Sequence, residues 1–222
     1  MIKLTKLKYY YKKNKVLDIE SFIINDGERI AFMGLNGAGK TTLVELILNL
    51  KNSYKGNFYC DKKYIYNAVF QDSNFNTDIS LKDIFYLYCK LYKISLDHNK
   101  YFNNFELKEI MNNKFKKISA GQQQKFKFLI ALLNKPNFLV LDEISTSLDY
   151  KWRIKIINII YNYVYQNNEI NLLLVSHNPE EVAKICNRVI FLEKGKIIRD
   201  FKLEGNYQER VKILEEMVKE DV

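Results

Sequence analysis

The segment from Gly34 to Thr41 constrains the fold of this chain more than any other part of its sequence. It reads Gly-Leu-Asn-Gly-Ala-Gly-Lys-Thr, so Gly34 and Gly39, with four residues between them, precede a lysine and a hydroxyl residue. Glycines let a backbone wrap closely around phosphate oxygens while several N–H groups point inward. A phosphate-binding loop of this type requires a strand before it and a helix after it.

Both flanks of the loop supply that context. Residues 29–33 form an apolar run of strand length. Apolar residues then recur at helical spacing: Leu43, Leu46, Ile47 and Leu50. Such a helix directs the positive end of its dipole at a bound phosphate. Lys40 is therefore predicted to reach the β- and γ-phosphates of a nucleotide, and Thr41 to offer its hydroxyl to Mg²⁺.

The rest of the chain alternates between strand-like and helix-like segments. Residues 138–141 and 172–175 are short apolar runs typical of buried parallel strands. An apolar stripe at helical spacing lies between them: Ile157, Ile160, Tyr161 and Val164. Two β-type runs open the chain at 2–11 and 16–24, and a hairpin is expected at 188–198. The alternation predicts an α/β fold with a mainly parallel sheet.

Composition limits the number of domains and the kind of partner. The 222 residues include only two prolines, and no flexible linker interrupts them, which favours a single domain. The longest apolar runs are too short to cross a bilayer, so any membrane activity requires another polypeptide. The net charge of +9 would suit nucleic acid or anionic lipid, but the lysines are scattered and form no dense run. An AT-rich genome would produce the same mixture of Lys, Asn, Ile and Tyr.

Two acids follow the apolar run at 138–141. A buried strand that delivers a carboxylate to its C-terminal end is a common way to hold Mg²⁺ beside a phosphate loop, which gives Asp142 that role. Glu143 is then placed to polarise the attacking water as a general base.

The segment Ile118-Ser119-Ala120-Gly121-Gln122 resembles the signature sequence of ATP-binding cassette (ABC) ATPases, usually Leu-Ser-Gly-Gly-Gln. Taken alone, Ser119 would simply cap a helix, and a helix N-terminus is also an anion site. The resemblance implies that Ser119 to Gln122 meet the γ-phosphate of ATP held by a partner subunit.

Further segments resemble the remaining motifs of that family. The resemblance implies that Gln71 contacts Mg²⁺ and the attacking water, that Asp149 lies in a loop coupling two ATP sites, and that His177 contacts the γ-phosphate. Tyr11 is the implied adenine-stacking ring, although Tyr9 and Tyr10 adjoin it. The implied ATP contacts are Tyr11, Gly34, Leu35, Asn36, Gly37, Ala38, Gly39, Lys40, Thr41 and Thr42. The implied metal ligands are Thr41, Gln71 and Asp142.

The resemblance spans about residues 2–198 and carries expectations for the whole molecule. It implies a P-loop NTPase core with a mainly parallel sheet, an N-terminal antiparallel β subdomain and a small helical subdomain at about 72–118. A C-terminal helix is expected at about 206–220, within a single domain of residues 1–222. Because few residues lie between Lys40 and Gln71, a shortened hairpin is expected around 56–66.

The family also implies a mechanism and partners. Two such subunits, identical or not, would enclose two ATP molecules with Mg²⁺ and drive a separately encoded integral membrane subunit. The chain would then lie on the cytoplasmic side of the membrane, held there by that subunit, with no nucleic acid partner. Residues 79–92 resemble the helical subdomain of exporters, which favours export.

The sequence departs from the family pattern at three positions, and other functions stay open. Ala120 replaces a usual glycine, Lys125 a common arginine and Ile144 a usual proline. One alternative is an ABC ATPase acting on ribosomes or nucleic acid, although those relatives carry two cassettes or a long coiled coil. Another is a module that holds nucleotide without hydrolysing it. A GTPase is disfavoured because residues 134–137 lack the acid that recognises guanine.

Overall fold

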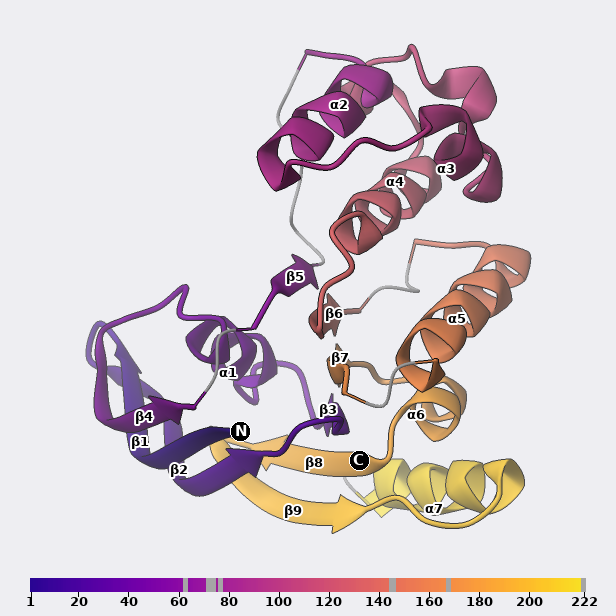
Figure 1. The fold of residues 1–222 in the computed structure, drawn as a ribbon. Helices are drawn as coiled ribbons and strands as arrows, with labels where there is room; N and C mark the ends of the chain where they lie inside the picture. The colour runs from indigo at the N-terminus through magenta and orange to yellow at the C-terminus, as the bar shows by residue number, and fades with distance from the viewer. Residues whose placement is uncertain (62–63, 71–74, 76–77, 144–146, 167–168, 221–222) are drawn as a thin grey trace.

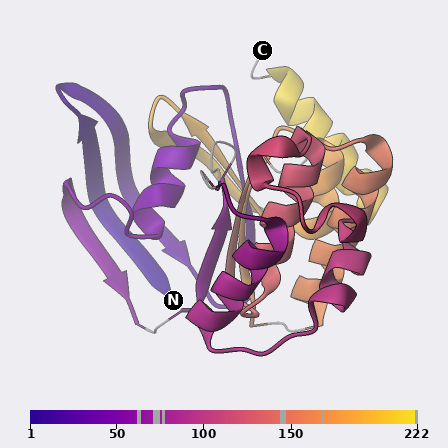
Figure 2. The same ribbon diagram turned by 90° about the horizontal axis from the view of Figure 1, so that it is seen from above.

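A computed structural model describes the chain except for residues 62–63, 71–74, 76–77, 144–146, 167–168 and 221–222. Its elements form layers: a three-stranded sheet, helix α1, a six-stranded sheet and a group of helices follow one another across the molecule (Figure 2). The expected α/β architecture with a mainly parallel sheet is confirmed.

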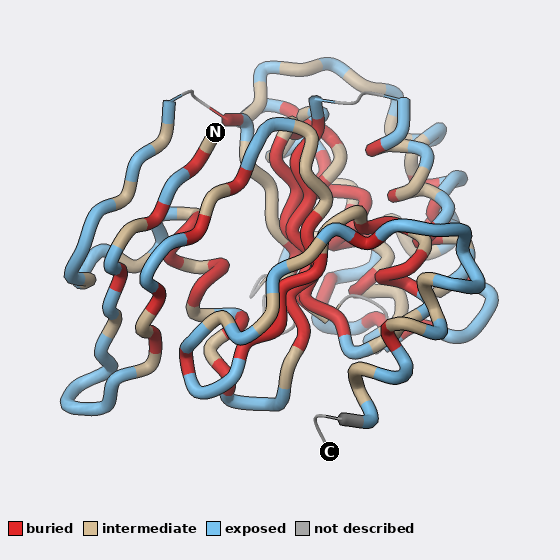
Figure 3. Tube along the Cα trace, turned by 90° about the horizontal axis from the view of Figure 1, so that it is seen from below, coloured by how far each residue is buried: buried red, intermediate tan, exposed pale blue. Residues whose placement is uncertain are grey.

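The six-stranded sheet has the order β5-β6-β7-β3-β8-β9. Its strands are β5 (Tyr66–Val69), β6 (Phe138–Asp142), β7 (Asn171–Val175), β3 (Arg29–Met33), β8 (Arg188–Glu193) and β9 (Lys196–Lys202). The first five are parallel, and β9 returns antiparallel beside β8 as the expected late hairpin. All five residues of both β6 and β7 are buried, as expected for parallel strands covered on both faces (Figure 3).

Successive residues of these strands enter two separate hydrophobic cores, because side chains alternate between the faces of a sheet. Leu139 and Leu141 of β6 belong to one core, together with α4 (Ala120–Leu132), α5 (Tyr150–Tyr165) and α6 (Pro179–Ile185). Phe138 and Val140 belong to the other, together with α1 (Lys40–Ile47) and the N-terminal strands. Helix α1 and helices α4 to α6 therefore cover opposite faces of the sheet (Figure 1).

The N-terminal sheet is antiparallel, with the order β2-β1-β4. It consists of β1 (Ile2–Tyr11), β2 (Asn14–Ile24) and β4 (Tyr54–Cys60). The expected hairpin at 56–66 is wrong, because β4 pairs with β1 whereas the next strand, β5, pairs with β6 in the other sheet. The turn-like composition of this segment marks a crossing between two sheets.

Residues 78–118 form short helices above the edge of the sheet where β5 and β6 lie (Figure 1). They are α2 (Leu81–Tyr92), α3 (His98–Asn104) and the 3-10 turns η1 (Lys108–Ile110) and η2 (Phe115–Lys117). Aromatic side chains from α2, α3, η2 and α4 pack together there, for example Phe85 on Phe102. We treat this segment as the helical subdomain. The chain continues after β9 into α7 (Tyr207–Glu220), which packs on α6.

Trp152, the only tryptophan of the chain, joins the helical segment to α4 and α5. Its indole Nε1 donates a hydrogen bond of 2.7 Å to Glu106, which follows α3. The ammonium of Lys125 on α4 lies 3.9 Å from the ring centroid, and that of Lys155 lies 4.3 Å from it. Lys155 also donates to Glu106 at 3.0 Å. Cation–π and charged hydrogen bonds thus hold three elements around one buried ring.

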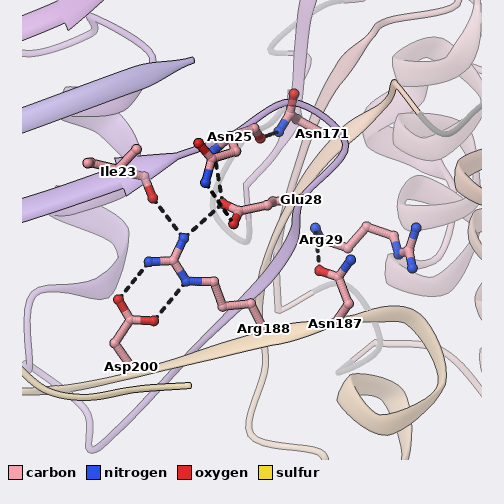
Figure 4. Close-up of polar contacts among 8 residues, drawn as sticks. All are labelled: Ile23, Asn25, Glu28, Arg29, Asn171, Asn187, Arg188 and Asp200. Carbon is pink, nitrogen blue, oxygen red and sulfur yellow. Dashed lines mark hydrogen bonds and ion pairs between the residues drawn. The ribbon is translucent and has the colours of Figure 1, made fainter. Parts of the chain in front are cut away.

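Arg188, at the start of β8, connects the two sheets (Figure 4). Its guanidinium makes paired hydrogen bonds of 2.7 and 2.6 Å to Asp200 on β9. Nη1 donates to the carbonyl of Ile23 on β2 and to the carboxylate of Glu28, both at 2.8 Å. The side chain is 14% exposed, so these charge-assisted bonds are only partly screened by water.

Replacing Arg188 with Met is expected to lower the free energy of unfolding by about 2–3 kcal/mol, since Asp200 and Glu28 both lose their positively charged partner at a partly buried site. Thermal or urea unfolding measures the change. Lys202→Met provides the matched control, because Lys202 is the exposed residue paired with Arg188 across the hairpin. A loss no larger than that of the control would contradict this account of the network.

Candidate functional site

The glycine-rich segment forms a loop between β3 and α1, and Lys40 lies over it. Gly39 caps α1 in a left-handed conformation. The Lys40 ammonium donates hydrogen bonds to the carbonyls of Gly34 at 2.7 Å and Leu35 at 3.0 Å. Lys40 is only 6% exposed, and this burial lowers the pKa of its ammonium, while the nearby acids Glu143 and Asp142 act in the opposite direction. The loop thus holds a buried cation in the position where a phosphate would bind.

The β8–β9 turn supports this loop from outside. Gly195 donates a backbone hydrogen bond of 3.0 Å to the carbonyl of Ala38. A Cβ on Gly195 would lie 2.1 Å from the carbonyl oxygen of Val16, and one on Gly34 would lie 2.1 Å from that of Leu192. Glycine is thus required at both positions, because another backbone segment leaves no room for a Cβ and because φ is positive. The sequence marked Gly195 only as a hairpin turn, since nothing in it shows which distant segment that turn contacts.

Asp142 lies at the C-terminal end of β6 beside the phosphate loop. Its side chain is buried, and Thr41 donates a hydrogen bond of 2.9 Å to its Oδ2. Burial raises the pKa of the Asp142 carboxyl, and the hydrogen bond from Thr41 opposes that change. Two of the three residues predicted to bind Mg²⁺, Thr41 and Asp142, are therefore in direct contact.

Glu143 and His177 follow neighbouring strands at the same edge. The Glu143 backbone has φ +49° and donates to the carbonyl of Val175 at 3.0 Å, so the glutamate leaves β6 in a sharp turn. His177 Nε2 lies 3.6 Å from Glu143 Oε1. Burial lowers the pKa of His177 and the positive charge of Lys40 acts in the same direction, while the nearby Glu143 carboxylate opposes both, so the net shift favours the neutral imidazole. Four of the predicted residues thus converge: Lys40, Asp142, Glu143 and His177.

The signature-like residues begin α4, on the face opposite α1. Ser119 and Gln122 form a capping box, in which the Ser119 side chain accepts from Gln122 N and the Gln122 side chain accepts from Ser119 N. A Cβ on Gly121 would lie 3.1 Å from the carbonyl oxygen of Ser147, so the signature turn contacts the loop before Asp149. Asp149 in turn caps α5 by accepting from Trp152 N at 2.9 Å. Ser119, Ala120, Ser147 and Asp149 are exposed.

Two other predicted positions have different outcomes. Tyr11 ends β1 and is 62% exposed, Tyr10 is 39% exposed and Tyr9 packs against the core of α1, so Tyr11 is the freest of the three to stack on a base. Its role stays a prediction. Gln71 lies outside the described residues.

Comparison with known proteins assigns the family. Residues 17–146 match the family model described as ABC transporter. The nickel import system ATP-binding protein NikE of Staphylococcus aureus (strain N315) is 32% identical over 205 residues, covering 88% of this chain and 87% of that protein. A dimeric ATP-binding cassette in a post-hydrolysis state with ADP and Pi superposes with a TM-score of 0.81 at 23% identity, over 92% of this chain and all of that one. A dimeric bacterial ABC transporter cassette gives a TM-score of 0.78 at 25% identity over the same shares.

These relatives do not support the expected export direction, because NikE is named as part of an import system. The short aromatic stretch at 79–92 that favoured export was too brief to separate the two directions. No helix in the described parts of the chain is long and apolar enough to cross a membrane. The chain belongs to the ABC transporter family, as an ATP-hydrolysing nucleotide-binding subunit.

Proposed function

We propose that two copies of this chain, or one copy and a related subunit, enclose two ATP molecules and drive a separate membrane subunit in uptake. The main support is that the phosphate loop and the signature residues begin helices on opposite faces of the sheet. A site built from both motifs is most simply completed by the loop of one subunit and Ser119 to Gln122 of another. The exposure of the signature turn and of Asp149 leaves that surface available to a partner.

The contact between Thr41 and Asp142 fits a magnesium ion. Mg²⁺ prefers hard oxygen ligands and is usually bound by one or two protein groups together with phosphates and water. Thr41 and Asp142 offer two such oxygens, and no group of three or more His, Cys, Asp or Glu in the described residues competes for the ion. When bound, the ion would neutralise charge on the phosphates.

The remaining residues have distinct roles in the proposed reaction. Lys40 exchanges its two loop carbonyls for phosphate oxygens, a stronger charged interaction. Glu143 orients and deprotonates the attacking water, and a ring N–H of His177 donates a hydrogen bond to the γ-phosphate. Tyr11 is assigned to adenine, and Gln71 is assigned to Mg²⁺ and the attacking water.

The direction of transport and the membrane partner are proposed from the relatives. NikE is named for nickel import, and we propose uptake for this chain without extending the nickel substrate to it. Purification from native membranes, followed by identification of the bound proteins, tests the proposal. An integral membrane subunit that raises the ATPase rate is the expected result. A chain recovered only with ribosomes or nucleic acid would overturn it.

A further inference from the structure

Two buried polar atoms near His177 face each other without hydrogen-bond partners. Buried side-chain atoms without a partner in the described residues are Arg153 Nε, Asn171 Oδ1 and Glu181 Oε1. The first and last are 3.9 Å apart, close enough for an ion pair but too far for a hydrogen bond. Because buried polar groups are almost always satisfied, a facing pair left open needs an explanation.

Glu181 determines the shape of the turn that holds His177. It lies on α6 and is 1% exposed. Its Oε2 accepts a hydrogen bond of 2.9 Å from the Ser176 hydroxyl, and the same hydroxyl oxygen accepts from Asn178 N at 3.0 Å. The residues on both sides of His177 are therefore tied to the Glu181 carboxylate. A shift of that carboxylate would move the imidazole relative to Glu143.

Arg153 connects the other end of the pair to the surface expected to face a partner. It lies in the first turn of α5, and its backbone N donates to the carbonyl of Asp149 at 2.9 Å. Asp149 is exposed and borders the signature turn through Ser147. Arg153 also lines a surface hollow together with Glu143 and His177, which gives the guanidinium room to move.

We propose that Arg153 and Glu181 are a positioning pair for ATP hydrolysis. Their ion pair tightens as the ATP-bound dimer assembles, and it ties the partner-facing start of α5 to the turn that holds His177. Closing the gap would satisfy both open atoms with one charge-assisted hydrogen bond. This inference rests on the proposed function, because it assumes hydrolysis in a dimer with His177 at the γ-phosphate.

Substitution of either residue tests the pair through steady-state ATPase kinetics and binding of a fluorescent ATP analogue. Glu181→Gln keeps the side-chain volume and an oxygen for Ser176 but removes the charge. Arg153→Met removes the guanidinium at a partly exposed position, so it remains informative if Glu181→Gln unfolds. Each is expected to lower kcat by about tenfold, with KM and nucleotide affinity within about twofold, because displaced catalytic groups slow the chemical step and leave binding unchanged.

Three comparisons separate positioning from a general structural effect. Arg153→Lys is expected to recover part of the lost kcat, and the double variant Arg153→Met/Glu181→Gln to be no slower than the worse single variant. Glu180→Gln is the matched control, with the same charge change at an exposed neighbour. Wild-type kcat in both single variants, or effects that add fully in the double variant, would overturn the pair. A wild-type protein that fails to hydrolyse ATP would instead overturn the proposed function.

Discussion

Glu143→Gln protein is expected to bind ATP, dimerise and release phosphate at least about a hundredfold more slowly than the wild type, the usual contribution of a general base. Glutamine preserves the size of the side chain but cannot accept the proton of the attacking water. Since Glu143 leaves β6 with a positive φ and a backbone bond to Val175, the substitution leaves its position unchanged. ATP that binds without being cleaved should then hold two subunits together.

Phosphate release and size-exclusion chromatography with Mg²⁺ and ATP measure these two effects separately. Slow turnover together with a dimer that appears only with ATP is the expected pattern. Glu180→Gln serves again as the control, with normal turnover. Wild-type phosphate release by Glu143→Gln would remove Glu143 from the role of base.

Lys40→Met is expected to abolish the response to ATP while leaving the free protein folded. Methionine has a similar length and no charge. The variant loses two hydrogen bonds to loop carbonyls, but it no longer has to bury a charged ammonium, whose pKa burial lowers in the wild type. The two effects offset each other. The phosphates of ATP, by contrast, lose their closest predicted cation.

Thermal unfolding with and without Mg²⁺ and ATP provides the measurement. Ligand at a hundred times its Kd stabilises a protein by about 2.7 kcal/mol, which raises the Tm by several degrees. That increase should disappear in Lys40→Met and persist in Lys151→Met, which changes an exposed lysine. An equal ATP-induced rise in Lys40→Met would show that Lys40 does not bind the phosphates.

Local sequence patterns predicted the parts of the site that are built from consecutive residues. The strand, glycine loop and helix around Lys40 each have their own signal, and the apolar run of β6 indicates where Asp142 and Glu143 emerge. Parallel strands end at one edge of a sheet, which places Glu143 and His177 at the same edge, but their meeting also depends on β6 and β7 being neighbours, which no local pattern indicates.

Contacts between distant segments were not predictable in this way. The Gly195 turn contacts the phosphate loop, and Arg188 on β8 bonds to residues of β2 and β9. Both contacts depend on how the two sheets pack against each other. The crossing of the chain from β4 to β5 was mistaken for a hairpin because strand partners, unlike strands, leave no local signal. Arg153 and Glu181 likewise look like ordinary surface charges in the sequence.

The ring of Trp152 has a practical consequence, since it is the single indole of the chain. Intrinsic tryptophan fluorescence, excited selectively, therefore reports on this one position without an added label. Its emission depends on the two ammonium groups beside it and on the bond to Glu106, which come from three separate elements. Any nucleotide-driven displacement of the helical segment relative to α5 would change the wavelength or the intensity of the Trp152 fluorescence in real time.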